Sequence, residues 1–356
     1  MNFDTSEEQE LLQETIAQFL ANECPATRVR EIFDGDTGHD PALWKGLMEL
    51  GLGGLVVPER FGGAGLDVID LALATETLAY GGAPGPFFGH SLAALAIALG
   101  GSDAQCERWL PRLAAGEALA SVAFAEADGC WQPEEWKLAA GKHLSGVKYF
   151  VPGAELADVF VVGTAGGGLA LVAAGEGVSV EAYEGVDRVR RMGTLRLEAA
   201  PAEVLGDTAL AARVRDAACV LLAADAFGTA QRLLDMAVDY ANQREQFGVT
   251  IGHFQALKHQ LADMALEIHP TRGLVWYAAH AFDHLPEEAP AAAATAKAHL
   301  GERFVDVARR SVEAHGGIGY TWECDVQFWL KRSLFDWSML GEPELHRRRS
   351  ADLLGW

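Results

Sequence analysis

The sequence predicts an α+β fold in which a small β-domain separates two helical regions. Apolar residues recur with a helical period in the first third of the chain and again in the last part. Between them, short apolar runs bounded by glycine clusters replace the helical pattern, which is typical of strands and hairpins. We therefore expect an N-terminal helical domain at 1–117, a middle β-domain at 118–208 and a C-terminal helical domain at 209–356.

Helical signals dominate the first region. Residues 5–8 form a helix-start pattern of Thr, Ser and two Glu. The apolar residues that follow share one helical face: Leu11, Leu12, Ile16, Phe19 and Leu20. Residues 41–52, 71–80 and 91–99 read as further helices, and the glycine-rich stretch at 58–65 reads as a loop. This region is expected to be an all-helical bundle.

The middle and last regions differ in the length of their apolar segments. Short runs predict strands at 119–125, 147–151, 159–162, 169–172 and 178–180. Much longer periodic segments predict helices at 210–244, 254–282 and 289–315. The change from short runs to long segments near residue 209 marks the expected start of the C-terminal domain.

Composition excludes several classes of protein. The chain carries 50 acidic and 28 basic residues, which gives a formal net charge of −22. A field of this sign repels nucleic acid and anionic membrane, so we expect neither as a partner. Five widely spaced cysteines without a C-x-x-C pair favour reduced thiols in the cytoplasm over disulfides or a zinc site. The acidic N-terminus does not resemble a signal peptide, and we expect no membrane-spanning segment.

Two short motifs in the last region suit a bound phosphate. Arg244 follows a predicted helix and precedes Phe247 and Gly248, and a guanidinium beside a glycine turn can hold a pyrophosphate. Gly316 and Gly317 follow the next long helix and permit close backbone approach to a ligand. Taken singly, each motif also fits a plainer interpretation: a surface arginine in a helix-terminating loop, and a helix stop.

The order of the motifs along the chain resembles that of the acyl-CoA dehydrogenases. The shared strings are Pro-Glu-x-Phe-Gly-Gly-x-Gly at 58–65, Gly-Val-Lys-Tyr-Phe-Val at 146–151, Ala-Asp-Val-Phe-Val-Val at 157–162, Arg-x-x-Phe-Gly at 244–248 and Gly-Gly-x-Gly at 316–319 with Glu323. The resemblance spans nearly the whole chain. It implies a middle β-barrel-like domain, a C-terminal four-helix bundle, an FAD cofactor and an acyl-CoA substrate.

The resemblance also implies roles for individual residues. A carboxylate would remove the α-proton of the thioester while the β-hydride passes to the flavin. Arg244 would contact the pyrophosphate and Phe247 would pack against the cofactor of a neighbouring subunit. The remaining implied contacts are Gln255 near the adenosine, Gly316 and Gly317 near the pyrophosphate or adenosine, main-chain atoms of Phe124, Ala125 and Glu126 at the isoalloxazine, and Phe150 beside that ring.

Several positions depart from the family pattern. The flavin-binding string of the β-domain lacks its serine at 125–131. Pro152 replaces a hydroxyl residue and supplies no donor. Glu313 stands where a glutamine is usual, and a carboxylate is a poor neighbour for a pyrophosphate. These changes put flavin binding by the lone chain in doubt.

The catalytic base is the largest departure. Gly341 falls at the position of the family's usual glutamate, and Glu342 follows it in a polar loop. The alternative position at the start of the long helix reads Ala-Ala-Cys at 217–219, with Asp216 before it and Asp225 on the apolar face. Glu342 and Asp225 are the candidate bases, but a solvated loop residue and a structural ion pair remain the competing interpretations.

Four functions stay open from the sequence. The chain could be an active dehydrogenase, similar to those acting on sterol or bile-acid side chains, or the non-catalytic subunit of a heteromeric one. A flavin oxidase or monooxygenase on the same fold is the third, and a helical binding module unrelated to flavin is the last. An electron-transfer flavoprotein and a homo- or hetero-oligomer, dimer or tetramer, are the partners that the resemblance implies. The acidic and thiol residues at 323–325 match no metal-ligand spacing, so we expect no metal.

Overall fold

The computed structural model describes residues 4–127 and 129–356. Its contacts divide the chain into two compact units. The first unit is Met1–Arg30, Ala72–Ala83 and Val220–Trp356, and the second is Glu31–Leu71 and Pro84–Cys219. The order of helices, then sheets, then helices confirms the expected fold class, whereas the three-region boundaries remain a prediction.

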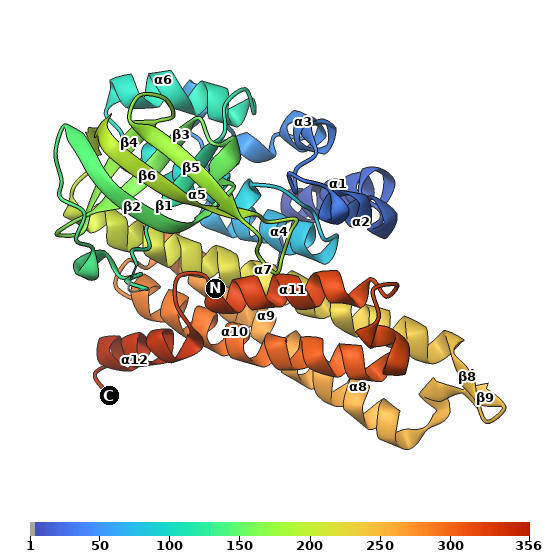
Figure 1. Ribbon diagram of the computed structural model, residues 1–356. Coiled ribbons are helices and arrows are strands. Elements are labelled where there is room, and N and C mark those ends of the chain that lie inside the picture. The colour runs from blue at the N-terminus through green and yellow to red at the C-terminus, as the bar shows by residue number, and fades with distance from the viewer. Residues whose placement is uncertain (1–3, 128) are drawn as a thin grey trace. The chain divides into compact units, whose positions relative to one another are not determined.

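The first unit consists mainly of helices. In α1 (Glu7–Glu23), Ser6 accepts a hydrogen bond from the amide of Gln9, and the Gln9 side chain accepts one from the amide of Ser6, which satisfies two donors at the helix start. The later helices are α8 (Gln255–Ile268), α9 (Arg272–His284), α10 (Ala289–Ala314), α11 (Val326–Ser338) and α12 (Pro343–Leu354). Helix α10 packs against each of the other four (Figure 1).

One helix of this unit differs from its prediction. The single helix expected at 254–282 is wrong, because a 3-10 turn at His269–Thr271 separates α8 from α9. Pro270 lies in that turn. Proline has no backbone N–H, and its ring clashes with the carbonyl four residues earlier, so α8 ends at Ile268.

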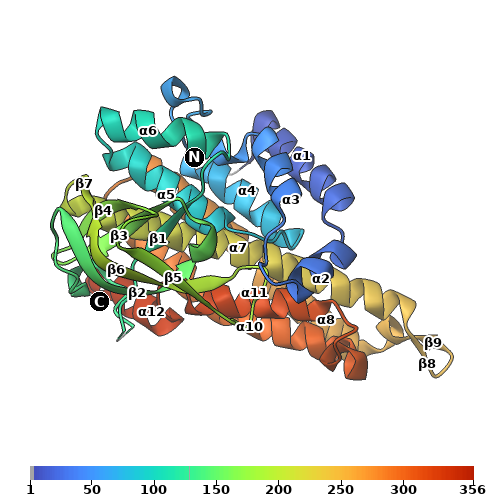
Figure 2. The same ribbon diagram turned by 45° about the horizontal axis from the view of Figure 1, so that its top comes forward.

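The second unit holds two sheets instead of one closed barrel. The first sheet has the order β1 (Ala120–Ala123), β3 (Val159–Thr164), β4 (Gly168–Ala173) and β7 (Glu203–Leu205), with β1 parallel to β3. The second is antiparallel, with the order β2 (His143–Pro152), β6 (Met192–Pro201) and β5 (Val178–Tyr183) (Figure 2). The helices of this unit include α3 (Pro41–Glu49), α5 (Phe87–Gly100) and α6 (Asp103–Ala114), and α2 (Ala26–Asp34) and α4 (Val68–Tyr80) cross the division.

A register shift in β2 sets the orientation of one candidate site residue, Phe150. Residues of both sheets form the core, among them Leu144, Phe160 and Leu195, each fully buried. The pairing of β2 with β6 shifts between Lys148 and Val151, and Phe150 within this shift has a positive φ of 53°. A bulge of this kind redirects a side chain away from its regular face, and Phe150 is 41% exposed whereas Val151 after it is fully buried.

Helix α7 (Thr208–Gln243) belongs to both units, because the division falls at Cys219. This helix is long and apolar enough to cross a membrane, although the sequence analysis predicts no membrane-spanning segment. However, 89% of its most apolar 18-residue window is buried within the structure. We therefore interpret α7 as a core helix, whose apolar residues serve packing.

Candidate flavin-binding residues and candidate bases

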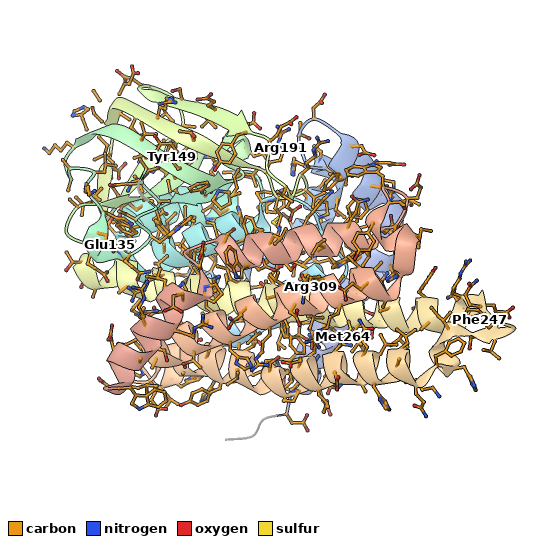
Figure 3. All side chains as sticks on the ribbon, turned by 60° about the horizontal axis from the view of Figure 1, so that its bottom comes forward. Glu135, Tyr149, Arg191, Phe247, Met264 and Arg309 are labelled. Atoms are coloured by element: carbon orange, nitrogen blue, oxygen red, sulfur yellow. The ribbon has the colours of Figure 1, made fainter. Side chains whose placement is uncertain are left out.

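Residues 244–255, here called the arm, project from the ends of α7 and α8. Strands β8 (Glu245–Gln246) and β9 (Val249–Thr250) form a short hairpin in it. Phe247 and Gly248 at the tip have φ values of 54° and 81°, a backbone that turns the chain sharply. The Phe247 side chain is 92% exposed and points away from the helices (Figure 3).

The polar candidates of the arm are exposed as well. The amide of Arg244 donates to the Tyr240 carbonyl, and the Arg244 carbonyl accepts from Ile251, so its backbone is fixed while its side chain is open to solvent. Gln255 begins α8 and is also exposed. The arm thus offers a cation, an amide and an aromatic ring to a group outside its own unit's core.

The glycine pair lies near the base of the arm. Tyr240, one helical turn before Arg244, stacks on His315 with 4.8 Å between ring centroids. His315 immediately precedes Gly316, whose φ is 64°. A Cβ atom added at either Gly316 or Gly317 would meet nothing within 4 Å, so a ligand could approach this backbone closely. The sequence reading missed Tyr240, which carries no motif of its own.

The β-domain candidates are arranged differently. Phe124 and Ala125 are buried, and the Phe124 ring stacks on Trp136 at 5.2 Å. The exposed ring of Phe150 is covered on one face by Trp131, with centroids 5.8 Å apart. Tyr183 meets its edge at 6.1 Å. An aromatic side chain therefore already occupies one face of the ring that the resemblance places beside the flavin.

A buried ion pair shapes the segment that carries Phe124. Nζ of Lys148, which is fully buried, donates to the Phe124 carbonyl at 3.1 Å and to Oε1 of Glu126 at 2.8 Å. The Glu126 carboxylate also accepts from the amides of Lys137 and Leu138. Burial lowers the pKa of Lys148. Burial acts to raise the pKa of Glu126, but the bonds from Lys148 and the two amides bring it below its usual value.

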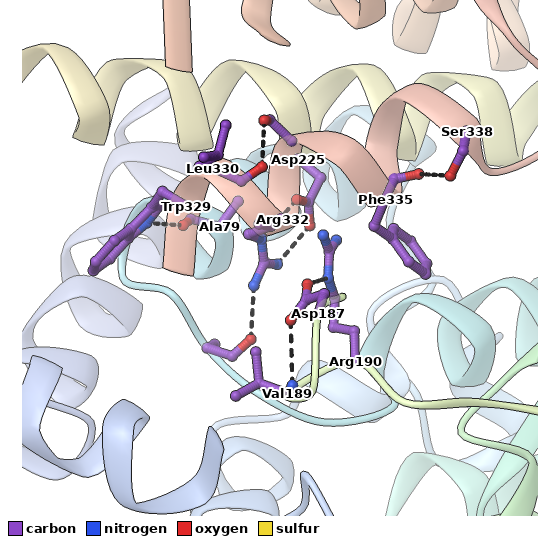
Figure 4. Close-up of polar contacts among 12 residues, drawn as sticks. Ala79, Asp187, Val189, Arg190, Asp225, Trp329, Leu330, Arg332, Phe335 and Ser338 are labelled. Atoms are coloured by element: carbon purple, nitrogen blue, oxygen red, sulfur yellow. Dashed lines mark hydrogen bonds and ion pairs between the residues drawn. The ribbon is translucent and has the colours of Figure 1, made fainter. Parts of the chain in front are cut away.

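Asp225 takes part in a buried ion pair. Its two carboxylate oxygens accept hydrogen bonds from Nε and Nη2 of Arg332 at 2.7 and 2.6 Å (Figure 4). Nη1 of Arg332 donates to the Ala83 carbonyl at 2.9 Å. Both side chains are only 6% exposed. A carboxylate held in this bidentate way is stabilised in its charged form, which favours the structural alternative over a base.

The other candidate base lies in an open position. Glu342 precedes α12, is exposed, and makes no side-chain cap bond to that helix. The two residues before it have positive φ values, 63° at Leu340 and 102° at Gly341. Nε2 of the buried His346 lies 3.0 Å from the Leu340 carbonyl. Asp216 is buried, and its Oδ1 accepts a single hydrogen bond from Nε of the adjacent Arg215 at 3.2 Å.

Comparison with known proteins defines the class of protein. The family profile "Acyl-CoA dehydrogenase, N-terminal domain" matches residues 6–117, and "Acyl-CoA dehydrogenase, C-terminal domain" matches residues 216–354. The chain therefore belongs to the acyl-CoA dehydrogenases, a family of FAD-dependent oxidoreductases. The resemblance found in the sequence is confirmed.

Three known proteins of this family are similar to the chain over nearly its whole length. It is 33% identical over 350 residues to the acyl-CoA dehydrogenase IpdE2 of Mycobacterium tuberculosis, covering 98% of each chain. A solved structure described as a Tcur3481-Tcur3483 steroid ACAD variant superposes with a TM-score of 0.91 at 32% identity, again with 98% of each chain covered. The ChsE4-ChsE5 complex of Mycobacterium tuberculosis contains a chain with a TM-score of 0.90 at 27% identity, covering 100% of this chain and 99% of that one.

The residues present fit two parts of FAD, the pyrophosphate and the isoalloxazine ring, unequally. The exposed arginine of the arm and the open backbone at Gly316 and Gly317 suit an anionic pyrophosphate. The β-domain face suits an isoalloxazine ring less well, because Trp131 covers Phe150 and Pro152 supplies no donor. Among residues 4–127 and 129–356, no three His, Cys, Asp or Glu side chains gather as metal ligands.

Proposed function

We propose that this chain is a subunit of an FAD-dependent acyl-CoA dehydrogenase and that its arm completes a flavin site in a neighbouring subunit. The observation that carries the proposal is Phe247, which is 92% exposed at the hairpin tip and has a positive φ. Within residues 4–127 and 129–356, the Phe247 ring meets the edge of Phe254, and most of its surface stays open to another molecule. Exposed aromatic and arginine side chains are typical anchors of an intermolecular site.

Each candidate residue has a part in this proposal. Arg244 would bind the pyrophosphate through paired N–H donors, and Phe247 would pack on the cofactor beside it. Gly316 and Gly317 would admit the nucleotide to the backbone, with Gln255 near the adenosine. Phe124, Ala125 and Phe150 would flank the ring system if Trp131 moved aside. When bound, FAD would accept the hydride from Cβ of the thioester.

The α-proton needs a carboxylate, and this chain offers a poor one. Gly341 has no side chain, and Asp225 is committed to Arg332. We therefore propose that a second, related chain supplies the base, in a hetero-oligomer of two or four subunits. Two similar structures, Tcur3481-Tcur3483 and ChsE4-ChsE5, are each named for a pair of chains, which supports this arrangement.

The substrate proposed is a CoA thioester with a steroid-derived acyl group. This inference rests on the similarity to the Tcur3481-Tcur3483 steroid ACAD, which is 32% identical over nearly the whole chain. An electron-transfer flavoprotein is the proposed acceptor of the electrons. A structure named for the electron-transferring flavoprotein of Acidaminococcus fermentans matches this chain with a TM-score of 0.91 at 25% identity, which supports that acceptor.

A second candidate is a chain that is catalytic by itself with Glu342 as the base. The observation in its favour is the position of this exposed carboxylate, one residue after Gly341. If Glu342 were the base, Glu342→Gln would abolish bleaching of the flavin by substrate without releasing the flavin. An oxygen-consumption assay separates either form of dehydrogenase from an oxidase or monooxygenase.

The deciding experiment is the visible absorption spectrum of the chain purified alone and co-expressed with a related dehydrogenase chain. We expect a colourless lone chain and a yellow complex. In that complex, Arg244→Gln should release flavin, whereas Arg309→Gln, an exposed arginine on α10, should not. Stoichiometric flavin in the lone chain would overturn the partner-subunit proposal and favour the second candidate.

A further inference from the structure

A cavity of about 330 Å³ in the first unit lies apart from every residue assigned to the flavin. The last turns of α1 contribute Ala17, Leu20 and Ala21 to its wall, and the end of α4 contributes Tyr80. Arg232 of α7 and Trp329 of α11 complete it, with a few further small residues. The wall is largely apolar, and its volume is at the lower end of the range for small-molecule sites.

Two aromatic rings hold the guanidinium of Arg232. It lies 5.5 Å from the ring centroid of Tyr80 and 5.3 Å from that of Trp329. Trp329 is itself fixed, because its indole N–H donates to the carbonyls of Ala79 and Tyr80 at 3.0 and 3.2 Å. Cation–π contacts on two rings orient the plane of the guanidinium without neutralising its charge.

No carboxylate of the described residues forms an ion pair with Arg232. Asp235, one turn further along α7, accepts the Tyr80 hydroxyl at 2.8 Å and the Gln231 amide at 3.0 Å. The Nε–H of Arg232 is buried and has no acceptor within the described part of the chain. Leaving a buried donor unpaired costs about 1–3 kcal/mol. This is unusual in a protein with 50 acidic residues and 28 basic ones.

We propose that this cavity binds a small organic carboxylate with an apolar body. The carboxylate would accept hydrogen bonds from the Nη–H groups of the Arg232 guanidinium, whose charge it would neutralise. The apolar body would lie along the small side chains of α1. The site uses none of the residues proposed to bind flavin or to act as base, so it stands or falls independently of the proposed function.

Calorimetric titration with butyrate and benzoate at constant ionic strength tests the site. We expect saturable binding with a Kd on the order of 1 mM, as befits a ligand of few atoms. Butyramide, the neutral counterpart of butyrate, should bind at least about tenfold more weakly. An absence of saturation up to about 50 mM, or equal binding of sulfate, would overturn the proposal.

Three variants locate the binding. Arg232→Gln should weaken butyrate binding at least about tenfold. Ala21→Phe, on the exposed side of α1, should block the cavity while leaving Arg232 in place, and it decides the matter if the first variant does not fold. Arg188→Gln is the matched control, because the Arg188 guanidinium also lies over a ring, that of Phe33 at 5.8 Å, but lines no part of this cavity.

The assembled oligomer provides the last test. We expect butyrate to bind the complex with a related chain as it binds the lone chain. Loss of binding on assembly would show that a protein surface fills the cavity, and it would overturn the proposal of a small-molecule site. Unchanged binding by both Arg232→Gln and Ala21→Phe would overturn it equally.

Discussion

Two buried polar residues, Asp225 and His90, have hydrogen-bond partners inside the chain, whereas the arm presents its arginine and its aromatic ring to solvent. Asp225 and Arg332 satisfy each other. The buried His90 lies 3.1 Å from the Leu113 carbonyl through Nε2 and accepts the Ala120 amide through Nδ1 at 3.4 Å. We therefore expect the buried pairs to stabilise the fold, and we propose that the arm binds another molecule. Substitutions in the first group should affect stability, and those in the arm should affect assembly.

The largest effect is expected at the buried ion pair. Asp225→Asn leaves the charge of Arg332 buried without its partner, which should lower the free energy of unfolding by about 3–5 kcal/mol. Glu342→Gln, the matched change at an exposed carboxylate, should stay within about 0.5 kcal/mol. Urea denaturation of both variants measures this. A stable Asp225→Asn protein that has lost only turnover would restore Asp225 as a candidate base.

The next largest effect is a loss of stability at acidic pH that depends on His90. Burial lowers its pKa from 6.5 to about 4. The unfolded chain therefore binds a proton more readily, so stability is highest above pH 6.5 and falls as the pH drops toward 4. The loss amounts to about 3 kcal/mol at most. Unfolding midpoints between pH 7.5 and 4.5 should fall more steeply for the wild type than for His90→Gln, and parallel curves would contradict the assignment.

A substitution in the arm should affect flavin binding and leave stability almost unchanged. Arg244→Gln removes paired donors to a phosphate, so FAD should dissociate from the complex about ten- to a hundredfold more readily. The unfolding free energy of the lone chain should change by less than about 0.5 kcal/mol. Flavin fluorescence on dilution reports the first quantity and urea denaturation the second. A substantially destabilised Arg244→Gln chain would place the arm among the folding residues.

The smallest effect is expected at Trp131, a residue that bears on both folding and the candidate flavin site. Trp131 stacks on Phe150 and so adds to folding while covering a candidate flavin contact. Trp131→Ser removes a stacking energy of about 1 kcal/mol. If that contact opposes the flavin, binding of added FAD by the lone chain should improve by up to about fivefold. Equilibrium dialysis measures the gain, with Trp356→Ser at the exposed C-terminus as control.

Periodicity predicted much of the fold. The expected helix at 210–244 is α7, and the apolar runs at 159–162 and 169–172 lie within β3 and β4. These elements follow from local patterns of apolar residues. The ion pair of Asp225 could not be predicted from such patterns, because Arg332 lies 107 residues away and no local pattern identifies it as the partner. Phe150 was singled out by resemblance, but its stacking with Trp131 depends on a bulge that no pattern in the strand announces.

Gly341 bears on the history of the chain as well as on its chemistry. Its φ of 102° lies in a region that residues with a Cβ atom avoid, and Leu340 before it already holds a positive φ. A glutamate introduced at position 341 would meet a backbone that costs about 1–3 kcal/mol to maintain, and the buried contact between His346 and the Leu340 carbonyl opposes its relaxation. One substitution would therefore not readily place a base at this position, and the loop would have to be rebuilt before it could hold a carboxylate there.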